Sequence, residues 1–293
     1  MKSENLPLKA GILIKASSKS TPLDHLPAQE VMSLIKDAGA LQLSGYASST
    51  DSFFDYTEKL GLSFIDYRGG AFQREEVNRK STLMTVTGHK RGFPIPLHGE
   101  LYYQRSQPDL LCFYCVSSAL LGGATTIANA REVYELLPAS TKKFFEDHPV
   151  KYIRRMPPSE WNKVYKTTDQ EEVAGFCEEL GMTHEFDSNG FLTTEYVASA
   201  FYQREDSKAF LNNILPNYYI QKLGRNEAGV LTHDNKEIPA EIIKSVEKVL
   251  KAQTLKVRLR PGEILIVNNR STLHGRRSFV GKRQIYLRMG SFK

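Results

Sequence analysis

Two histidines and one glutamate stand out in this sequence because their types and spacing suit a metal ion. His98 and Glu100 are separated by a single glycine, and His274 lies 176 positions after His98 (274 − 98), at the end of an apolar segment. Two imidazoles and one carboxylate, bound on one face of an ion, are the ligand set of non-haem Fe(II) centres with open coordination positions. We therefore expect His98, Glu100 and His274 to be the metal ligands and the catalytic residues.

The His-x-Glu pair is weak evidence by itself. The 7 histidines and 33 acidic residues in 293 positions give about 0.8 chance occurrences of His-x-Asp/Glu. The context raises its value, because an extended segment at 93–97 precedes it. Since side chains alternate along a strand, His98 and Glu100 are expected to point to the same face, with Gly99 pointing away. The third ligand must then come from a distant segment, which His274 supplies.

Several further segments occur in a fixed order between these ligands and the C-terminus. A Gly-Gly-Ala-Thr-Thr-Ile-Ala run covers 122–128, a Phe-Leu-Asn-Asn run covers 210–213, and a Pro-Gly turn, apolar strand and Asn-Asn-Arg run cover 261–270. His274-Gly275-Arg276 and Arg288 follow. With His98-Gly99-Glu100, this pattern resembles the taurine dioxygenase and clavaminate synthase-like superfamily of Fe(II)/2-oxoglutarate-dependent oxygenases, over roughly positions 81 to 293. A departure is Asp234-Asn235, where the family has Asp-Gly.

The resemblance implies an α+β fold with a double-stranded β-helix (jelly-roll) core, covering helices and a mixed insertion. It implies Fe(II), 2-oxoglutarate and O2 as cofactor and co-substrates, and oxidation of an unactivated C–H bond with release of succinate. Thr125 matches a family threonine whose hydroxyl helps to hold 2-oxoglutarate. A glutamate at position 100, rather than an aspartate, resembles the clavaminate synthase-like members of the superfamily, which act on amino-acid-like substrates. In related halogenating enzymes this position is Ala or Gly, so Glu100 argues against chlorination.

An arginine near the C-terminus is expected to hold the distal carboxylate of 2-oxoglutarate, because a guanidinium is a flat, permanently charged fork. On a predicted strand over 283–290, Gln284, Tyr286 and Arg288 share one face, while Ile285, Leu287 and Met289 share the other. We assign the first face to the cavity and choose Arg288, whose offset from His274 also fits the family. Arg283 falls on the other parity and ranks second.

The bulk composition is that of an ordinary globular enzyme, with 41% hydrophobic and 25% charged residues. We expect one domain over 1–293, with jelly-roll strands mainly at 81–130 and 194–293 and a helical insertion at about 131–252. Apolar periodicity predicts helices at 27–38, 49–61, 131–137, 140–147, 170–180 and 239–252, and strands at 41–46, 81–87, 110–116, 125–128, 255–259, 263–267 and 283–290.

Cysteine usage and charge limit the partners. Cys112, Cys115 and Cys177 are interpreted as reduced core thiols of a cytoplasmic protein, because the CxxC pair lies in an apolar run without a second pair.

No apolar run approaches the length of a membrane span, so no membrane partner is expected. The net charge of +6 is spread along the chain, which argues against nucleic acid. An anionic co-substrate would itself require a locally positive pocket.

Three functional hypotheses follow. The leading one is hydroxylation of an amino acid or a related small polar metabolite. The second keeps the chemistry but uses an amino acid tethered to a carrier protein, or a peptide, or ends in desaturation or cyclisation. The third, a distant alternative, is a non-catalytic jelly-roll binding protein.

Other residues carry weaker expectations. Trp161 is interpreted as a packing anchor. Asn212 is left open between a substrate contact and a structural role. The remaining histidines are left unassigned: His25, His89, His148, His184 and His233.

Overall fold

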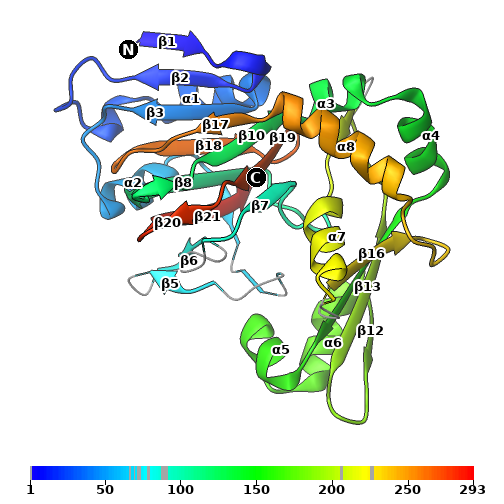
Figure 1. Ribbon diagram of the computed structural model, residues 1–293. Helices are drawn as coiled ribbons and strands as arrows, with labels where there is room; N and C mark the ends of the chain where they lie inside the picture. The colour runs from blue at the N-terminus through cyan, green and yellow to red at the C-terminus, as the bar shows by residue number, and fades with distance from the viewer. Residues whose placement is uncertain are drawn as a thin grey trace.

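The computed structural model describes residues 2–293 except 66, 69, 71–73, 78–79, 87–91, 205–206 and 225–227. Two β-sheets form its centre (Figure 1). The strands of the larger sheet lie in the order β1 (Lys2–Asn5), β2 (Ile12–Lys15), β3 (Ala40–Ser44), β18 (Ile264–Asn268), β8 (Leu110–Ser117), β21 (Gln284–Ser291), β6 (Lys80–Thr85), β5 (Glu76–Val77). Strand β4 (Ser63–Phe64) also belongs to this sheet and pairs with β21. The smaller has the order β17 (Leu255–Val257), β10 (Thr125–Asn129), β19 (Thr272–Arg276), β7 (Ile95–His98).

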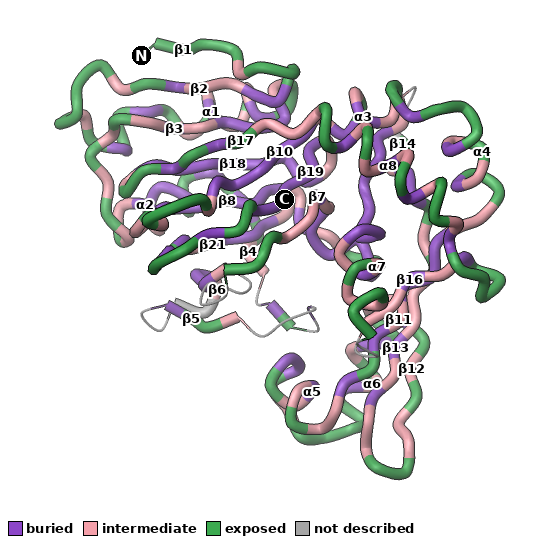
Figure 2. Tube along the Cα trace, viewed as in Figure 1, coloured by how far each residue is buried: buried purple, intermediate pink, exposed green. Residues whose placement is uncertain are grey.

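The central strands β8 and β18 of the larger sheet are buried on both faces, which explains why they are almost continuously apolar in sequence. Along β8, Phe113 belongs to the core shared with the smaller sheet, whereas Cys112 and Tyr114 belong to the core under helices α1 (Ala28–Ala38) and α2 (Thr50–Glu58). Figure 2 shows β8 and β18 as largely buried along their length. Helix α2 begins at Ser49, whose side chain accepts from the Ser52 amide in a capping box.

The segment from 130 to 253 lies outside these two central sheets, which together are called the sandwich below. It contains α3 (Ala130–Leu136), α4 (Ala139–Asp147), β11 (Val150–Met156), α5 (Pro158–Tyr165), α6 (Gln170–Glu179), β12 (Thr183–Phe186), β13 (Leu192–Ala198), β14 (Phe201–Arg204), β15 (Ser207–Phe210), α7 (Ile214–Lys222), β16 (Ala228–Thr232) and α8 (Ala240–Gln253). Strands β12, β13, β11 and β16 form a sheet of their own, and β14 pairs with β15. Helix α7 lies between that sheet and the sandwich, in contact with β16 and β7 (Figure 1).

The predicted fold class, a jelly-roll core with covering helices, is confirmed, but one boundary was wrong. The strands between 194 and 232 were expected in the jelly roll, whereas they hydrogen-bond to one another and to β11 within the insertion. The insertion is therefore mixed, as the expected fold class had it, whereas the helical description attached to 131–252 was too narrow. The short strands β9 (Leu121–Gly122) and β20 (Phe279–Val280) pair separately, and 3-10 turns cover Pro7–Lys9 and Leu23–His25.

The three cysteines are buried and free of disulfides, as expected for core thiols. Burial raises the pKa of Cys112 to about 12 and that of Cys115 to about 11. Of the helices within the described part of the chain, none has the length and apolar character needed to cross a membrane.

Candidate metal centre

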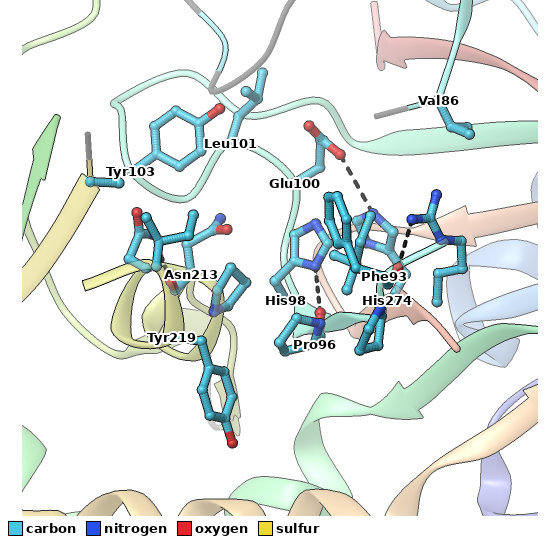
Figure 3. Close-up of a pocket in the computed structure, with 18 of the residues that line it drawn as sticks. Val86, Phe93, Pro96, His98, Glu100, Leu101, Tyr103, Asn213, Tyr219 and His274 are labelled. Atoms are coloured by element: carbon cyan, nitrogen blue, oxygen red, sulfur yellow. Dashed lines mark hydrogen bonds and ion pairs between the residues drawn. The ribbon is translucent and has the colours of Figure 1, made fainter. Parts of the chain in front are cut away.

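His98, Glu100 and His274 come together between the two sheets. Strands β7 and β19 are antiparallel neighbours in which His98 pairs directly with His274, so the two imidazole centroids are 4.3 Å apart. One donor atom from each of the three residues lies within 4.8 Å of the other two. Figure 3 shows Glu100 directed toward His274, with His98 beside them. The structure thus brings together the three side chains that the sequence analysis selected, and their role as metal ligands stays a prediction.

Glu100 reaches the histidines for a different reason from the one expected. Strand β7 ends at His98, so strand alternation does not position Glu100. The Asn269 side chain does: it accepts from the Glu100 amide (2.8 Å) and donates to the Glu100 carbonyl (3.1 Å). Gly99 allows the turn, because a Cβ there would lie 2.4 Å from the Tyr102 ring. A buried amide from the Asn-Asn-Arg run therefore fixes the path of the loop.

The tautomer of His98 is set by the backbone. Its Nδ1 lies 2.8 Å from the Pro96 carbonyl oxygen, which requires a proton on Nδ1 and leaves Nε2 as a free ligand atom. The His274 Nε2 lies 3.5 Å from Glu100 Oε2. Both imidazoles thus offer Nε2 to the space in front of the carboxylate.

The ionisation of these groups suits a divalent cation. Burial, followed by the neighbouring His274, lowers the pKa of His98 to about 4. Burial alone would raise the pKa of Glu100, but Arg74 and the two histidines hold it well below its usual range. Neutral imidazole and ionised carboxylate are the forms that bind a metal. Two histidines and one carboxylate fit Fe(II) and leave coordination positions open toward the cavity.

A cavity of about 730 Å³ opens in front of the three residues. Strands β7, β8, β10, β19 and β21 form one side, and residues of the insertion, including Asn213 and Tyr219, form another (Figure 3). Such a volume is typical of small-molecule sites. The insertion therefore completes the wall that the jelly roll leaves open.

One end of the cavity carries Thr125, Arg276 and Arg283. Arg283 donates from Nε to the Gly123 carbonyl (2.9 Å) and from Nη2 to Thr125 Oγ1 (3.2 Å). Burial lowers the pKa of Arg276 to about 10, and burial with repulsion from Arg276 lowers the pKa of Arg283 to about 10. Among the described residues, no carboxylate pairs with Arg283. The positive charge of Arg283 at this end of the cavity would therefore attract an anionic ligand.

Arg288 does not lie in this cavity, and the parity assignment was inverted. Its guanidinium points to the opposite face of the sheet, where it donates to Thr57 Oγ1 (2.7 Å) and Thr82 Oγ1 (2.8 Å), and also to Glu58. The Phe64 ring lies 3.5 Å from its guanidinium carbon. Ile285, Leu287 and Met289 face the interior between the sheets instead. Arg283 shares their parity, which is why the second-ranked arginine is the one in the cavity.

Several site residues were missed by the sequence reasoning. Arg74, Arg154 and Asn213 line the cavity, but none of them lies in a motif with a metal-site spacing. Asn213 belongs to the Phe-Leu-Asn-Asn run at 210–213 and Asn269 to the Asn-Asn-Arg run at 268–270, but no role was assigned to either residue.

The open question about Asn212 is settled by its contacts. Its side chain donates to the Ala200 carbonyl and accepts from the Ile214 amide, so its role is structural. Trp161 is buried and donates to the Gly190 carbonyl, as a packing anchor does. Among the unassigned histidines, His89 lies outside the described residues.

Comparison with known proteins agrees with this geometry. The sequence profile of the taurine catabolism dioxygenase TauD, TfdA family matches residues 6–289. A clavaminate synthase-like protein of Arabidopsis thaliana is 27% identical over 271 residues, which cover 86% of this chain and 82% of the relative.

Solved structures share the fold. PvcB of Pseudomonas aeruginosa superposes with a TM-score of 0.62 at 16% identity, over 97% of this chain and 87% of PvcB. PvcB is an Fe, alpha-ketoglutarate dependent oxygenase from an isonitrile synthetic pathway. An asparagine oxygenase in complex with Fe(II), 3-hydroxyasparagine and succinate gives a TM-score of 0.56 at 17% identity, over 90% and 78% of the two chains.

The family resemblance and the enzyme class expected from the sequence are confirmed. Because the profile spans nearly the whole chain, and because the two histidines and the glutamate converge as such a centre requires, the chain belongs to the TauD, TfdA family and is an Fe(II)/2-oxoglutarate-dependent dioxygenase.

Proposed function

We propose that His98, Glu100 and His274 hold Fe(II), and that Arg283 with Thr125 binds the distal carboxylate of 2-oxoglutarate. The enzyme then oxidises a C–H bond of an amino-acid-like small molecule, most simply by hydroxylation. The observation that carries this proposal is that three donor atoms within 4.8 Å of one another and the Arg283–Thr125 pair share one cavity.

The bound metal would supply oxidative decarboxylation of 2-oxoglutarate coupled to C–H oxidation, and the protein's own residues position the reactants. Arg283 has one nitrogen on Thr125 and another on the Gly123 carbonyl, so its fork is held before the co-substrate arrives. Phe113 and Leu287 line the cavity beside the metal ligands. Their apolar surface excludes water and strengthens the electrostatic contacts made there.

A small substrate fits the dimensions of the site. A cavity of about 730 Å³ has room for 2-oxoglutarate together with a molecule of amino-acid size. The asparagine oxygenase neighbour acts on an amino acid, and the excess of arginine over glutamate along the cavity suits polar, acidic ligands. A binding protein without turnover is not favoured, because the ligand triad is complete.

One observation favours a second candidate, in which the substrate is an amino acid tethered to a carrier protein. Phe93, Tyr219 and Leu223 line the cavity and are 44%, 40% and 75% exposed. These apolar side chains give the cavity an apolar rim that could accommodate a longer, tethered substrate. Activity on the tethered form alone, and not on the free amino acid, would select this candidate.

We also propose that residues 1–293 act as one unit, since the cavity takes residues from both sheets and from the insertion. The three free thiols fit a reducing compartment, for which the cytoplasm is our proposal.

The test is Glu100→Ala. Removal of one of three protein ligands, and of the negative charge beside the dication, should abolish tight Mn(II) or Fe(II) binding under anaerobic conditions and the release of succinate from 2-oxoglutarate. Glu195→Ala, a half-exposed carboxylate on the insertion sheet paired with Lys151, is the matched control and should behave as wild type. Wild-type metal affinity in Glu100→Ala would remove the metal assignment.

A further inference from the structure

The cavity carries more positive than negative charge. Among the described residues that line it, the arginines are Arg74, Arg154, Arg276 and Arg283, and the carboxylates are Glu100 and Glu160. A bound divalent metal adds to this excess, and the dianion 2-oxoglutarate offsets a comparable amount. A cavity lining of this composition suits anionic ligands.

Arg74 is the arginine nearest the metal ligands by its contacts. Its Nη2 donates to Glu100 Oε1 at 2.7 Å, and the two side chains are 4% and 7% exposed. Its Nη1 contacts the Met289 sulfur at 3.7 Å, which is a weak acceptor. Its Nε is buried without a hydrogen-bond partner within the described ranges. A group with five N–H donors thus has one oxygen acceptor among the residues that the structure describes.

The two oxygens of Glu100 face different partners. Oε1 receives the Arg74 hydrogen bond, while Oε2 lies 3.5 Å from His274 Nε2. A metal held by Oε2 and the two imidazoles would therefore leave the Arg74–Glu100 hydrogen bond in place, and the Arg74 donors without an oxygen acceptor among the described residues would face the ligand. The Tyr67 ring lies 4.4 Å from the guanidinium carbon, so the flat face of Arg74 rests on an aromatic surface.

Arg74 and Arg283 lie toward opposite ends of the cavity. Arg74 contacts Met289, and Arg283 comes six positions before Met289 in the same chain segment (289 − 283), which corresponds to roughly 20 Å along a strand. Between them, Leu287 pairs with Phe113, whose ring centroid is 5.7 Å from that of His274. The metal ligands thus lie between two cationic ends.

We propose that Arg74 binds a carboxylate of the primary substrate, and that this enzyme is therefore selective for a small carboxylic acid, such as a free α-amino acid. This inference rests on the proposed function, which assigns the Arg283 end to 2-oxoglutarate. The substrate then extends from Arg74 toward the metal, and the carbon next to the metal ligands is the one presented for oxidation. A carboxylate matches the planar fork that Arg74 offers.

The experiment uses the full chain loaded anaerobically with Mn(II) and 2-oxoglutarate. The probes are the standard L-amino acids and their α-carboxamides, and the readouts are calorimetric affinity and the shift in thermal midpoint. At least one acid should bind, and its carboxamide should bind at least about tenfold more weakly, because the amide carries no charge for Arg74. Arg74→Gln should weaken binding of that acid by at least about tenfold as well.

Two variants complete the design. Arg74→Lys keeps the charge beside Glu100 but not the fork, so it should bind the acid with intermediate affinity. Arg155→Gln, which removes a partly exposed arginine paired with Asp187, is the matched control and should bind it as wild type does.

Each alternative outcome contradicts the proposal. Equal binding of acid and carboxamide, an Arg74→Gln variant as tight as wild type, or no binding acid among the probes would each overturn it. Mn(II) and 2-oxoglutarate binding are measured before any acid is added. Their failure in the wild type would count against the proposed function, whereas their success without acid binding would count against Arg74 alone.

Discussion

Arg283, directly before strand β21, and Arg288 within it lie on opposite sides of the sheet and differ in how their charge is neutralised. On the inner face, Arg283 is held by uncharged groups, the Gly123 carbonyl and the Thr125 hydroxyl. On the outer face, Arg288 is enclosed by Thr57, Thr82, Glu58 and two phenylalanine rings. The outer arginine has its counter-charge within the fold, whereas the inner one is left to pair with a ligand. A buried arginine indicates a binding site when its own protein does not neutralise it.

The largest effect that tests this contrast is expected for Arg283→Gln. Loss of the inner guanidinium should weaken 2-oxoglutarate binding to the Mn(II)-loaded protein by roughly 2–5 kcal/mol, the cost of truncating one partner of a buried charged pair. Mn(II) affinity should change much less. Calorimetry with 2-oxoglutarate, before and after the substitution, provides the measurement. A variant that binds the co-substrate as tightly as wild type would mean that Arg283 is not its anchor.

Arg288→Gln should show the reverse pattern. The substitution breaks the pairing with Glu58 and the stacking on Phe54 and Phe64, so the free energy of unfolding should fall by about 2–4 kcal/mol. 2-Oxoglutarate affinity should stay near the wild-type value at a temperature where the variant is folded. Urea denaturation and calorimetry on the same sample separate the two effects. A specific loss of 2-oxoglutarate affinity at wild-type stability would restore the original assignment of Arg288.

Thr125→Val is expected to have a smaller effect on 2-oxoglutarate affinity than Arg283→Gln, and it tests the partner of Arg283 on the inner face. Valine keeps the shape but removes the hydroxyl that receives the Arg283 hydrogen bond, so 2-oxoglutarate binding should weaken by about 1 kcal/mol. In an Arg283→Gln background the same substitution should cost less, because the two residues act as a unit. A double-mutant cycle by calorimetry measures this coupling. Strictly additive effects would indicate that Thr125 does not act through Arg283.

Much of the sandwich was predictable from sequence because its strands obey local rules. The run at 264–268 is buried on both faces, and its continuous apolar character shows this directly. The convergence of His98, Glu100 and His274 was also predictable, since their residue types and order are unusual in combination. Periodicity on the strand at 284–291 correctly separated two faces, but it does not say which face meets the cavity. The face that meets the cavity is decided by where α2 packs. Helix α2 packs against the face that carries Arg288, which donates to the Phe54 carbonyl and the Thr57 hydroxyl of that helix.

The insertion was the least predictable part. Strand β13 pairs with β11 and β12 over sequence separations that no local pattern encodes, so it was assigned to the wrong sheet. Arg154 enters the cavity from β11, and Arg74 enters it from the segment before β5. Neither has a neighbouring sequence signal, because their importance arises from tertiary proximity to Glu100 and Tyr103. Cavity-lining residues of this kind become visible once the chain is folded.

The Asn269 side chain bonds to the backbone of residue 100 on both sides and not to its carboxylate. These two contacts therefore do not depend on which side chain occupies position 100. Under the proposed function, an exchange of Glu100 for Asp, Ala or Gly would alter the coordination of the metal and leave both Asn269 contacts in place. A variant at position 100 can therefore lose metal affinity while both Asn269 contacts persist, so a defect in metal binding at this position is separable from a defect in the course of the loop.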